Sequence, residues 1–204
     1  MLKVGLTGSI AVGKTFVIGV FKELGAHVLD ADQTARDVVK PGTKGLRQIV
    51  DQFGENVLTD SGELDRPKMA SIVFADEKKR KLLNSIIHPL VFEEQDKWLK
   101  EQERNDPNGV GIVDAALMIE SGGYKRFDRI IVVWCEPEIQ LKRLMLRDDL
   151  AVADAEKRIA SQMRQEEKKR YADHLIDTSK GFEDTRSQVV TLFARLKEAA
   201  ESAG

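Results

Sequence analysis

Cysteine is almost absent from this sequence: among 204 residues there is one, Cys135, accompanied by three histidines. A single cysteine cannot form a disulfide within the chain, and so few thiol and imidazole groups leave little for a zinc site. No apolar run approaches the roughly 20 residues that a membrane-spanning helix needs. We therefore expect a cytoplasmic protein that has no disulfide, no zinc cage and no membrane partner.

An excess of charge of one sign is also absent. Lys and Arg number 32 and Asp and Glu number 34, which gives a formal net charge of -2. Proteins dedicated to nucleic acids usually present a strongly basic surface, so we expect no nucleic-acid partner. The length favours one main domain with room for an insertion. We expect a monomer or a weak homo-oligomer.

What the sequence does contain is a series of short apolar segments, each followed by a helical pattern. This alternation is typical of parallel β/α units and predicts an α/β fold, a doubly wound five-stranded parallel sheet. The predicted helices include residues 13–24, a helix that continues through Val39, and a final helix from Asp184. The predicted strands are residues 2–7, 27–30, 110–114, 129–134 and 174–177.

Two segments differ in character from the predicted sheet. Residues 43–104 are almost entirely helical in pattern, with a break expected at His88-Pro89, and residues 148–172 are highly charged. We expect the first to be a helical insertion and the second an arginine-bearing lid. The nucleotide-binding core would then consist of residues 1–42, 105–147 and 173–204.

The turn after the first predicted strand has the pattern G-x-x-x-x-G-K-[ST]. Its glycines let backbone N–H groups approach phosphate oxygens, and the helix that follows directs its positive end at the same anion. Lys14 would contact the β- and γ-phosphates of a nucleotide, and the Thr15 hydroxyl would ligate Mg²⁺. The loop residues expected to bind the nucleotide are Gly8, Ile10, Ala11, Val12, Gly13, Lys14 and Thr15.

Three aspartates follow predicted strands at the edge where parallel sheets carry their functional groups. Asp30 and Asp32 follow the second strand, and Asp114 ends the third. Phosphoryl transfer to an alcohol needs a carboxylate that accepts the proton of the attacking hydroxyl, a role for which Asp32 is the candidate. Asp114 has the position of a carboxylate that orients magnesium-bound water. Each could instead be an ordinary helix-capping or strand-end residue.

Several basic residues are further candidates with structural alternatives. Arg36 lies four residues after Asp32, so it either forms a salt bridge along a helix or contacts substrate. His88 either packs at a helix boundary or contacts substrate. Arg143 and Arg147 also stand four apart, and the arginines of the charged segment could close over the transferring phosphate or form a solvated helix face.

The combination of these motifs resembles the dephospho-coenzyme A kinase family, from residue 3 to about residue 180. The first motif alone is common to all P-loop proteins, so only the combination is specific. The motifs are, in this sequence, GLTGSI at 5–10, GKT at 13–15, DAD at 30–32 with Arg36, VVKPG at 38–42, His88-Pro89, VDAALMIE at 113–120 and LKRLMLRD at 141–148.

The resemblance implies a P-loop kinase fold and transfer of phosphate from ATP to the ribose 3′-hydroxyl of dephospho-CoA, the last step in making coenzyme A. Residues 43–104 would help to hold dephospho-CoA. The implied roles are catalysis by Asp32, Lys14 and Arg143, binding of ATP by the phosphate loop and Arg147, binding of substrate by Asp32, Arg36, His88 and Glu120, and binding of Mg²⁺ by Thr15 and Asp114.

The sequence departs from the family pattern at a few positions. Ala11 and Val12 replace the usual Gly and Ser of the loop, where backbone groups bind the ligand, and Ala116 replaces a proline. Arg164 and the Thr178-Ser179 pair also differ from the family pattern. The resemblance therefore does not define the geometry of the lid or the contacts with adenine.

Two other functions remain as alternatives. A nucleoside monophosphate kinase commonly carries D-G-x-P-R, where this sequence has Asp30-Ala31-Asp32. A GTP-dependent switch would need N-K-x-D, which is absent from the sequence.

Overall fold

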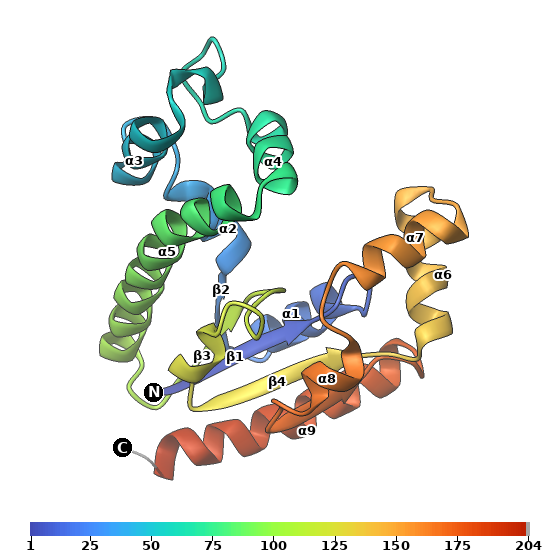
Figure 1. Cartoon of the computed structure of the whole chain (residues 1–204). Helices are drawn as coiled ribbons and strands as arrows, with labels where there is room; N and C mark the ends of the chain where they lie inside the picture. The colour runs from blue at the N-terminus through green and yellow to red at the C-terminus, as the bar shows by residue number, and fades with distance from the viewer. Residues whose placement is uncertain (203–204) are drawn as a thin grey trace. The chain divides into compact units, whose positions relative to one another are not determined.

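All five predicted strands are present in the computed structural model, which describes residues 1–202. They form one parallel sheet in the order β2-β3-β1-β4-β5 (Figure 1). The predicted doubly wound sheet is confirmed. Its strands are β1 (Leu2–Gly8), β2 (His27–Asp30), β3 (Val110–Asp114), β4 (Arg129–Trp134) and β5 (His174–Asp177).

The helices follow the predicted alternation with the strands. Two short 3-10 helices, η1 (Glu55–Val57) and η2 (Gly123–Arg126), lie in connections. The α-helices are α1 (Lys14–Glu23), α2 (Ala31–Asp37), α3 (Lys44–Phe53), α4 (Arg66–Ala75), α5 (Glu77–Asn105), α6 (Pro137–Asp148), α7 (Val152–Ala160), α8 (Gln165–Lys169) and α9 (Phe182–Ser202).

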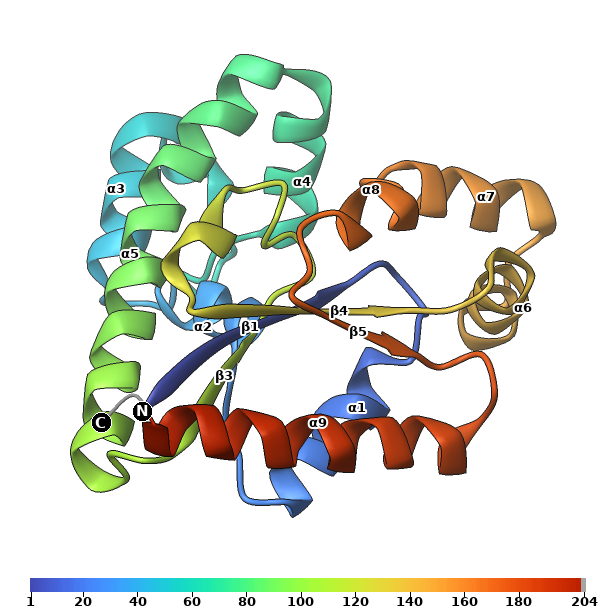
Figure 2. The same ribbon diagram turned by 90° about the horizontal axis from the view of Figure 1, so that it is seen from below.

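Helices α1 and α9 lie side by side against one face of the sheet (Figure 2). Their contact includes two aromatic pairs, Phe16 with Phe182 at 4.8 Å and Phe21 with Phe193 at 6.2 Å between ring centroids. Alternate residues of β1, β3 and β4 point into this layer, because successive side chains of a strand face opposite sides. Burial of this apolar face fixes the sheet and therefore the loop that follows β1.

The chain divides into two compact units. Unit 1 comprises residues 1–30 and the described residues from 99 onward, and unit 2 comprises Ala31–Trp98. The bounds differ from the expected insertion of residues 43–104, because α2 belongs to unit 2 and the last turns of α5 belong to unit 1. In unit 2 the core is small and centres on the buried Val39, Ile49, Val57 and Met69.

The break expected at His88-Pro89 is wrong, because Pro89 lies inside the single helix α5. A proline within a helix removes a hydrogen bond and costs about 3 kcal/mol or more. Ile86, which packs against the unit 2 core, and Val91, which is buried, lie on either side of this proline. Tertiary packing on both sides therefore keeps the helix continuous.

Two helix ends also differ from the prediction. Helix α2 ends at Asp37 rather than Val39. The Lys40 N–H donates to the Asp37 carbonyl at 3.2 Å in a turn, and Pro41 disfavours helical backbone at the residue before it. The final helix begins at Phe182 rather than Asp184, directly after Gly181, whose φ is +94°. The contact of the Phe182 ring with α1 accounts for this earlier start.

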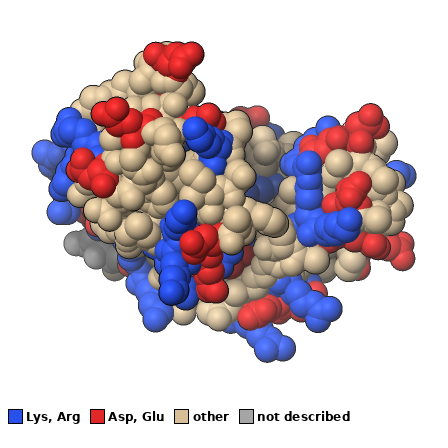
Figure 3. Space-filling model, turned by 45° about the horizontal axis from the view of Figure 1, so that its top comes forward, with Lys and Arg blue, Asp and Glu red and all other residues tan. Residues whose placement is uncertain are grey.

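The surface charge and the apolar character of the helices can be compared with the composition. Acidic and basic side chains are intermixed over the face drawn in Figure 3. Of the helices in residues 1–202, none combines the length and the apolar character that crossing a membrane requires.

Candidate nucleotide and phosphoryl-transfer site

The loop between β1 and α1 has the geometry of an anion-binding loop. A Cβ at Gly8 would lie 2.6 Å from the Val133 carbonyl oxygen, so only glycine lets β1 lie this close to β4 at its end. Gly13 has a φ of +87° and precedes α1 without a side-chain cap. The N–H groups at the start of α1 therefore remain available to a phosphate.

Lys14 and Asp114 face each other at the end of the sheet. The Lys14 ammonium forms a salt bridge with the Asp114 carboxylate, and the two side chains are 19% and 11% exposed. Parallel pairing of β1 with β3 sets Leu6 opposite Asp114, which brings the end of β3 beside the phosphate loop. Asp30 is the register partner of Asp114 on β2, so two of the three predicted aspartates end neighbouring strands.

Arg143, on α6, lies against the phosphate loop. Its guanidinium donates to the hydroxyl and to the carbonyl oxygen of Thr178, both at 2.8 Å. A Cβ at Gly13 would lie 3.4 Å from the same guanidinium. Arg143 is thus held beside the residue that opens α1, where a triphosphate would lie.

Arg147 stands one helical turn further along α6 and has a different environment. Its guanidinium forms a two-pronged pair with Asp148, whose carboxylate also accepts from Arg158 at 2.7 Å. Hydrogen bonding to Asp148 raises the pKa of Arg147, and the same pair lowers the pKa of the Asp148 carboxyl. Its role as an ATP contact stays a prediction.

The charged segment 148–172 contains two parts that differ in packing. Helix α7 is largely exposed, with Ala155 as its buried residue. Helix α8 is fixed to β4 and to the loop after β3: the Lys168 side chain is buried, and the Lys169 ammonium lies 3.3 Å from the centroid of the Trp134 ring. Mobility of the whole segment as a lid stays a prediction.

Glu120 contacts α8 and the segment before it. Its carboxylate pairs with the Lys168 ammonium at 2.9 Å and accepts from the Met163 N–H at 3.3 Å. The same ammonium donates to the Ala116 carbonyl at 2.8 Å. Glu120 therefore already binds two groups of its own chain, and its contact with substrate stays a prediction.

The remaining candidates belong to unit 2. Asp32 lies in the first turn of α2 and Arg36 in its last turn, on one face of the helix. Arg66 donates to the Arg36 carbonyl at 3.3 Å, which ties α4 to α2. His88 lies 6.0 Å from Phe92 between ring centroids, and burial lowers the pKa of its imidazole.

Sequence reasoning missed a set of side chains that hold the phosphate loop from outside. The Ile10 N–H donates to Gln162 at 2.8 Å, and the Ile10 carbonyl accepts from Gln140 at 2.8 Å. The Val12 carbonyl accepts from the Thr178 hydroxyl at 2.7 Å. Uncharged side chains far apart in sequence give no local pattern, so sequence reasoning connected Thr178 only with the adenine and did not place these residues on the phosphate loop.

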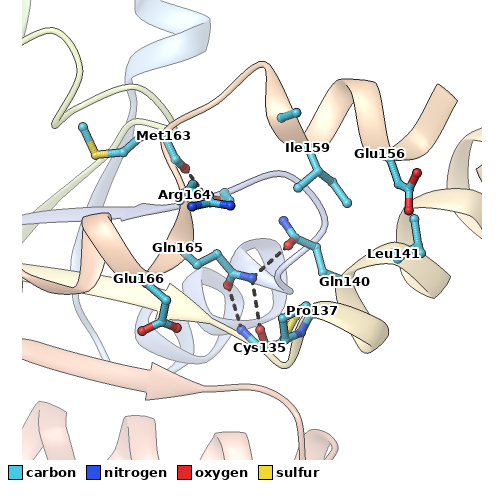
Figure 4. A pocket seen from close by; sticks show the side chains of 12 residues that line it. Cys135, Pro137, Gln140, Leu141, Glu156, Ile159, Met163, Arg164, Gln165 and Glu166 are labelled. Atoms are coloured by element: carbon cyan, nitrogen blue, oxygen red, sulfur yellow. Dashed lines mark hydrogen bonds between the residues drawn. The ribbon is translucent and has the colours of Figure 1, made fainter. Parts of the chain in front are cut away.

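Beside these contacts lies a cavity of about 620 Å³ between α6 and α7 (Figure 4). Ser9 of the phosphate loop, Leu141 and Ile159 contribute to its lining. Cys135, directly after β4, also lines this cavity, and the residue as a whole is only 1% exposed. Burial raises the pKa of this thiol above its usual value.

Comparison with known proteins identifies the family. Residues 2–184 match the dephospho-CoA kinase family. This chain belongs to the dephospho-CoA kinase family. A dephospho-CoA kinase of Listeria monocytogenes is 44% identical over 194 residues, which cover 94% of this chain and 96% of that protein.

Two further relatives agree with this assignment. A dephospho-CoA kinase domain-containing protein of Danio rerio is 43% identical over 98% of this chain and 88% of its own length. The structure of a dephospho-CoA kinase from Campylobacter jejuni matches with a TM-score of 0.72 and 29% identity, over 97% of this chain and 98% of that one. The likeness extends over both compact units.

Proposed function

We propose that this chain transfers the γ-phosphoryl group of ATP to the ribose 3′-hydroxyl of dephospho-CoA, giving coenzyme A and ADP. Membership of the dephospho-CoA kinase family over residues 2–184 carries this proposal. The phosphate loop with its Lys14–Asp114 pair supplies the parts that such a transfer needs.

Lys14 and Arg143 stabilise the charge that develops on the transferring phosphoryl group. The Lys14 ammonium is paired with Asp114 and so lies at the end of β3, from where its flexible stem can turn to the β- and γ-phosphates. Arg143 is anchored by Thr178 and needs little reorganisation to meet a phosphate oxygen. Donors placed in advance are the most effective stabilisers of transition-state charge.

Asp32 is the proposed general base. It accepts the proton of the 3′-hydroxyl as the oxygen attacks the γ-phosphorus, and the bond from that phosphorus to the β–γ bridging oxygen breaks to release ADP. The position of Asp32 in the first turn of α2, two residues after β2, supports this role, as does the placement of Asp30 beside Asp114 at the sheet edge. We also propose that Arg36, His88 and Glu120 each contact the substrate.

The residues present fit a magnesium ion. Thr15 and Asp114 offer oxygen ligands, and among residues 1–202 no cluster of three or more His, Cys, Asp or Glu could hold a metal alone. Mg²⁺ keeps several waters and binds through one or two protein oxygens plus substrate phosphates, which agrees with this set. The chemistry that Mg²⁺ supplies when bound is neutralisation of charge on the β- and γ-phosphate oxygens.

The experiment that tests the proposal is an acceptor screen that records ADP release from ATP. Dephospho-CoA, AMP, shikimate and no acceptor are compared under one condition, and Lys14→Ala serves as the control for contaminating activity. We expect release that depends on dephospho-CoA. Release driven best by AMP would favour the nucleoside monophosphate kinase alternative, and release without an acceptor would favour a nucleotide-dependent switch.

A further inference from the structure

The phosphate loop contains a residue in a backbone conformation that its side chain disfavours. Ala11 has a φ of +61°, in the left-handed region, and it lacks the freedom of glycine there. Such a residue persists only where its surroundings hold it in place. The residue before it, Ile10, has both of its backbone groups bound by glutamine side chains.

The bond from Gln140 decides the direction of one N–H group of the loop. A trans peptide is planar, so the carbonyl of one residue and the N–H of the next point in opposite directions. Because Gln140 holds the Ile10 carbonyl from outside, the Ala11 N–H must point the other way. Thr178 acts likewise on the Val12 carbonyl and thus on the N–H of Gly13.

The side chain of Gln140 is itself held in place by burial and by a hydrogen bond. It is 2% exposed, and its carboxamide oxygen accepts from Gln165 at 2.8 Å. Gln165 in turn bonds both the N–H and the carbonyl of Cys135 at 3.1 Å, which ties the pair to the end of β4 (Figure 4). A continuous series of hydrogen bonds therefore connects the end of β4 to the phosphate loop through Gln165 and Gln140.

We propose that Gln140 is a positioning residue for the phosphates of the nucleotide: it locks the Ile10–Ala11 peptide so that the Ala11 N–H faces the ligand although Ala11 is strained. The proposal rests on the proposed function in that it takes the loop to bind a nucleoside triphosphate. Without this bond, relaxation of Ala11 to negative φ would rotate the peptide and withdraw a donor from the phosphates.

The test measures binding of ATP, inorganic tripolyphosphate and adenosine by calorimetry, without an acceptor. We expect Gln140→Leu to raise the Kd of ATP and of tripolyphosphate about tenfold, the factor that corresponds to the usual cost of a left-handed alanine. The Kd of adenosine should stay unchanged. Gln140→Glu, which keeps an acceptor for Gln165 but loses the donor to Ile10, should act in the same direction and serves if the first variant does not fold.

Two further variants separate positioning from general stability. Asp128 accepts from the Lys3 N–H at 2.8 Å, at the end of β1 away from the phosphate loop. Asp128→Leu removes this bond between side chain and backbone and should lower the Tm without raising the Kd of tripolyphosphate. In an Ala11→Gly background, where positive φ is no longer disfavoured, the effect of Gln140→Leu should shrink to about threefold or less.

Several outcomes would overturn the proposal. These are an unchanged Kd of tripolyphosphate in both Gln140 variants, an equal loss of adenosine affinity, or the same effect of Gln140→Leu in both backgrounds. Since no acceptor is present, failure of dephospho-CoA to act as substrate would leave these measurements unaffected. The two proposals can therefore fail separately.

Discussion

The two compact units of the chain differ in the size of the buried core that supports them. In unit 1, β1 and β3 are buried at nearly all positions and β4 at its four central ones. Side chains from α6, from the segment before α8 and from the residue after β5 hold the phosphate loop. In unit 2, a small core supports α2 to α4 and most of α5. The phosphate loop thus rests on the larger core, whereas Asp32, Arg36 and His88 belong to the unit with the smaller core.

The largest expected effect comes from unit 2. Asp32→Asn should lower turnover by about 10²–10⁴-fold, the range for a positioned general base, and should leave the affinity for Mg·ATP nearly unchanged. Steady-state rates together with calorimetry of ATP binding measure both quantities. A variant that binds ATP poorly, or that turns over normally, would remove Asp32 from this role.

The next effect comes from unit 1. Lys14→Ala should lower turnover by about 10²–10³-fold, because a charge that stabilises the transferring phosphoryl group is lost. The fold should persist, because Lys14 lies outside the core. Among residues 1–202, the ion pair of its ammonium is with Asp114. Circular dichroism controls for folding. More than about a tenth of normal turnover, a loss below 1.4 kcal/mol, would contradict the assignment of the loop.

Asp32 and Lys14 belong to the parts of the molecule that the sequence alone could predict. The strands and the loop were predictable because periodicity and the spacing of Gly8, Gly13 and Lys14 are local patterns. The continuity of α5 through Pro89 was not, because tertiary packing overrides a local rule. The contacts of Gln140, Gln162 and Lys168 join residues distant in sequence, and a single sequence carries no sign of such pairs.

A smaller effect separates the two carboxylates. Asp114→Asn should raise the magnesium concentration needed for half-maximal rate by about 10–100-fold, since removing a group that orients metal ligands typically costs this much affinity. Titration of Mg²⁺ in Asp114→Asn and in Asp32→Asn compares the units directly. A normal response of Asp114→Asn with a raised requirement in Asp32→Asn would reverse the two roles.

The smallest expected effect concerns the charged segment 148–172. Hydrogen exchange should be rapid in α7 without ligands and slow down when ATP and dephospho-CoA are both bound. Helix α8 should exchange slowly in both states, because Lys168 is buried and Gln165 is bonded to Cys135. Equal exchange of α7 with and without ligands would leave it as a solvated helix and exclude it from a lid.

The proposed reaction passes phosphate from ATP to one hydroxyl of dephospho-CoA. Phosphorus NMR of the product, with ADP measured in the same sample, tests this most directly. We predict one new phosphomonoester on the ribose 3′-oxygen for each ADP formed. A phosphate on another hydroxyl, or ADP formed with inorganic phosphate and no new ester, would contradict the account.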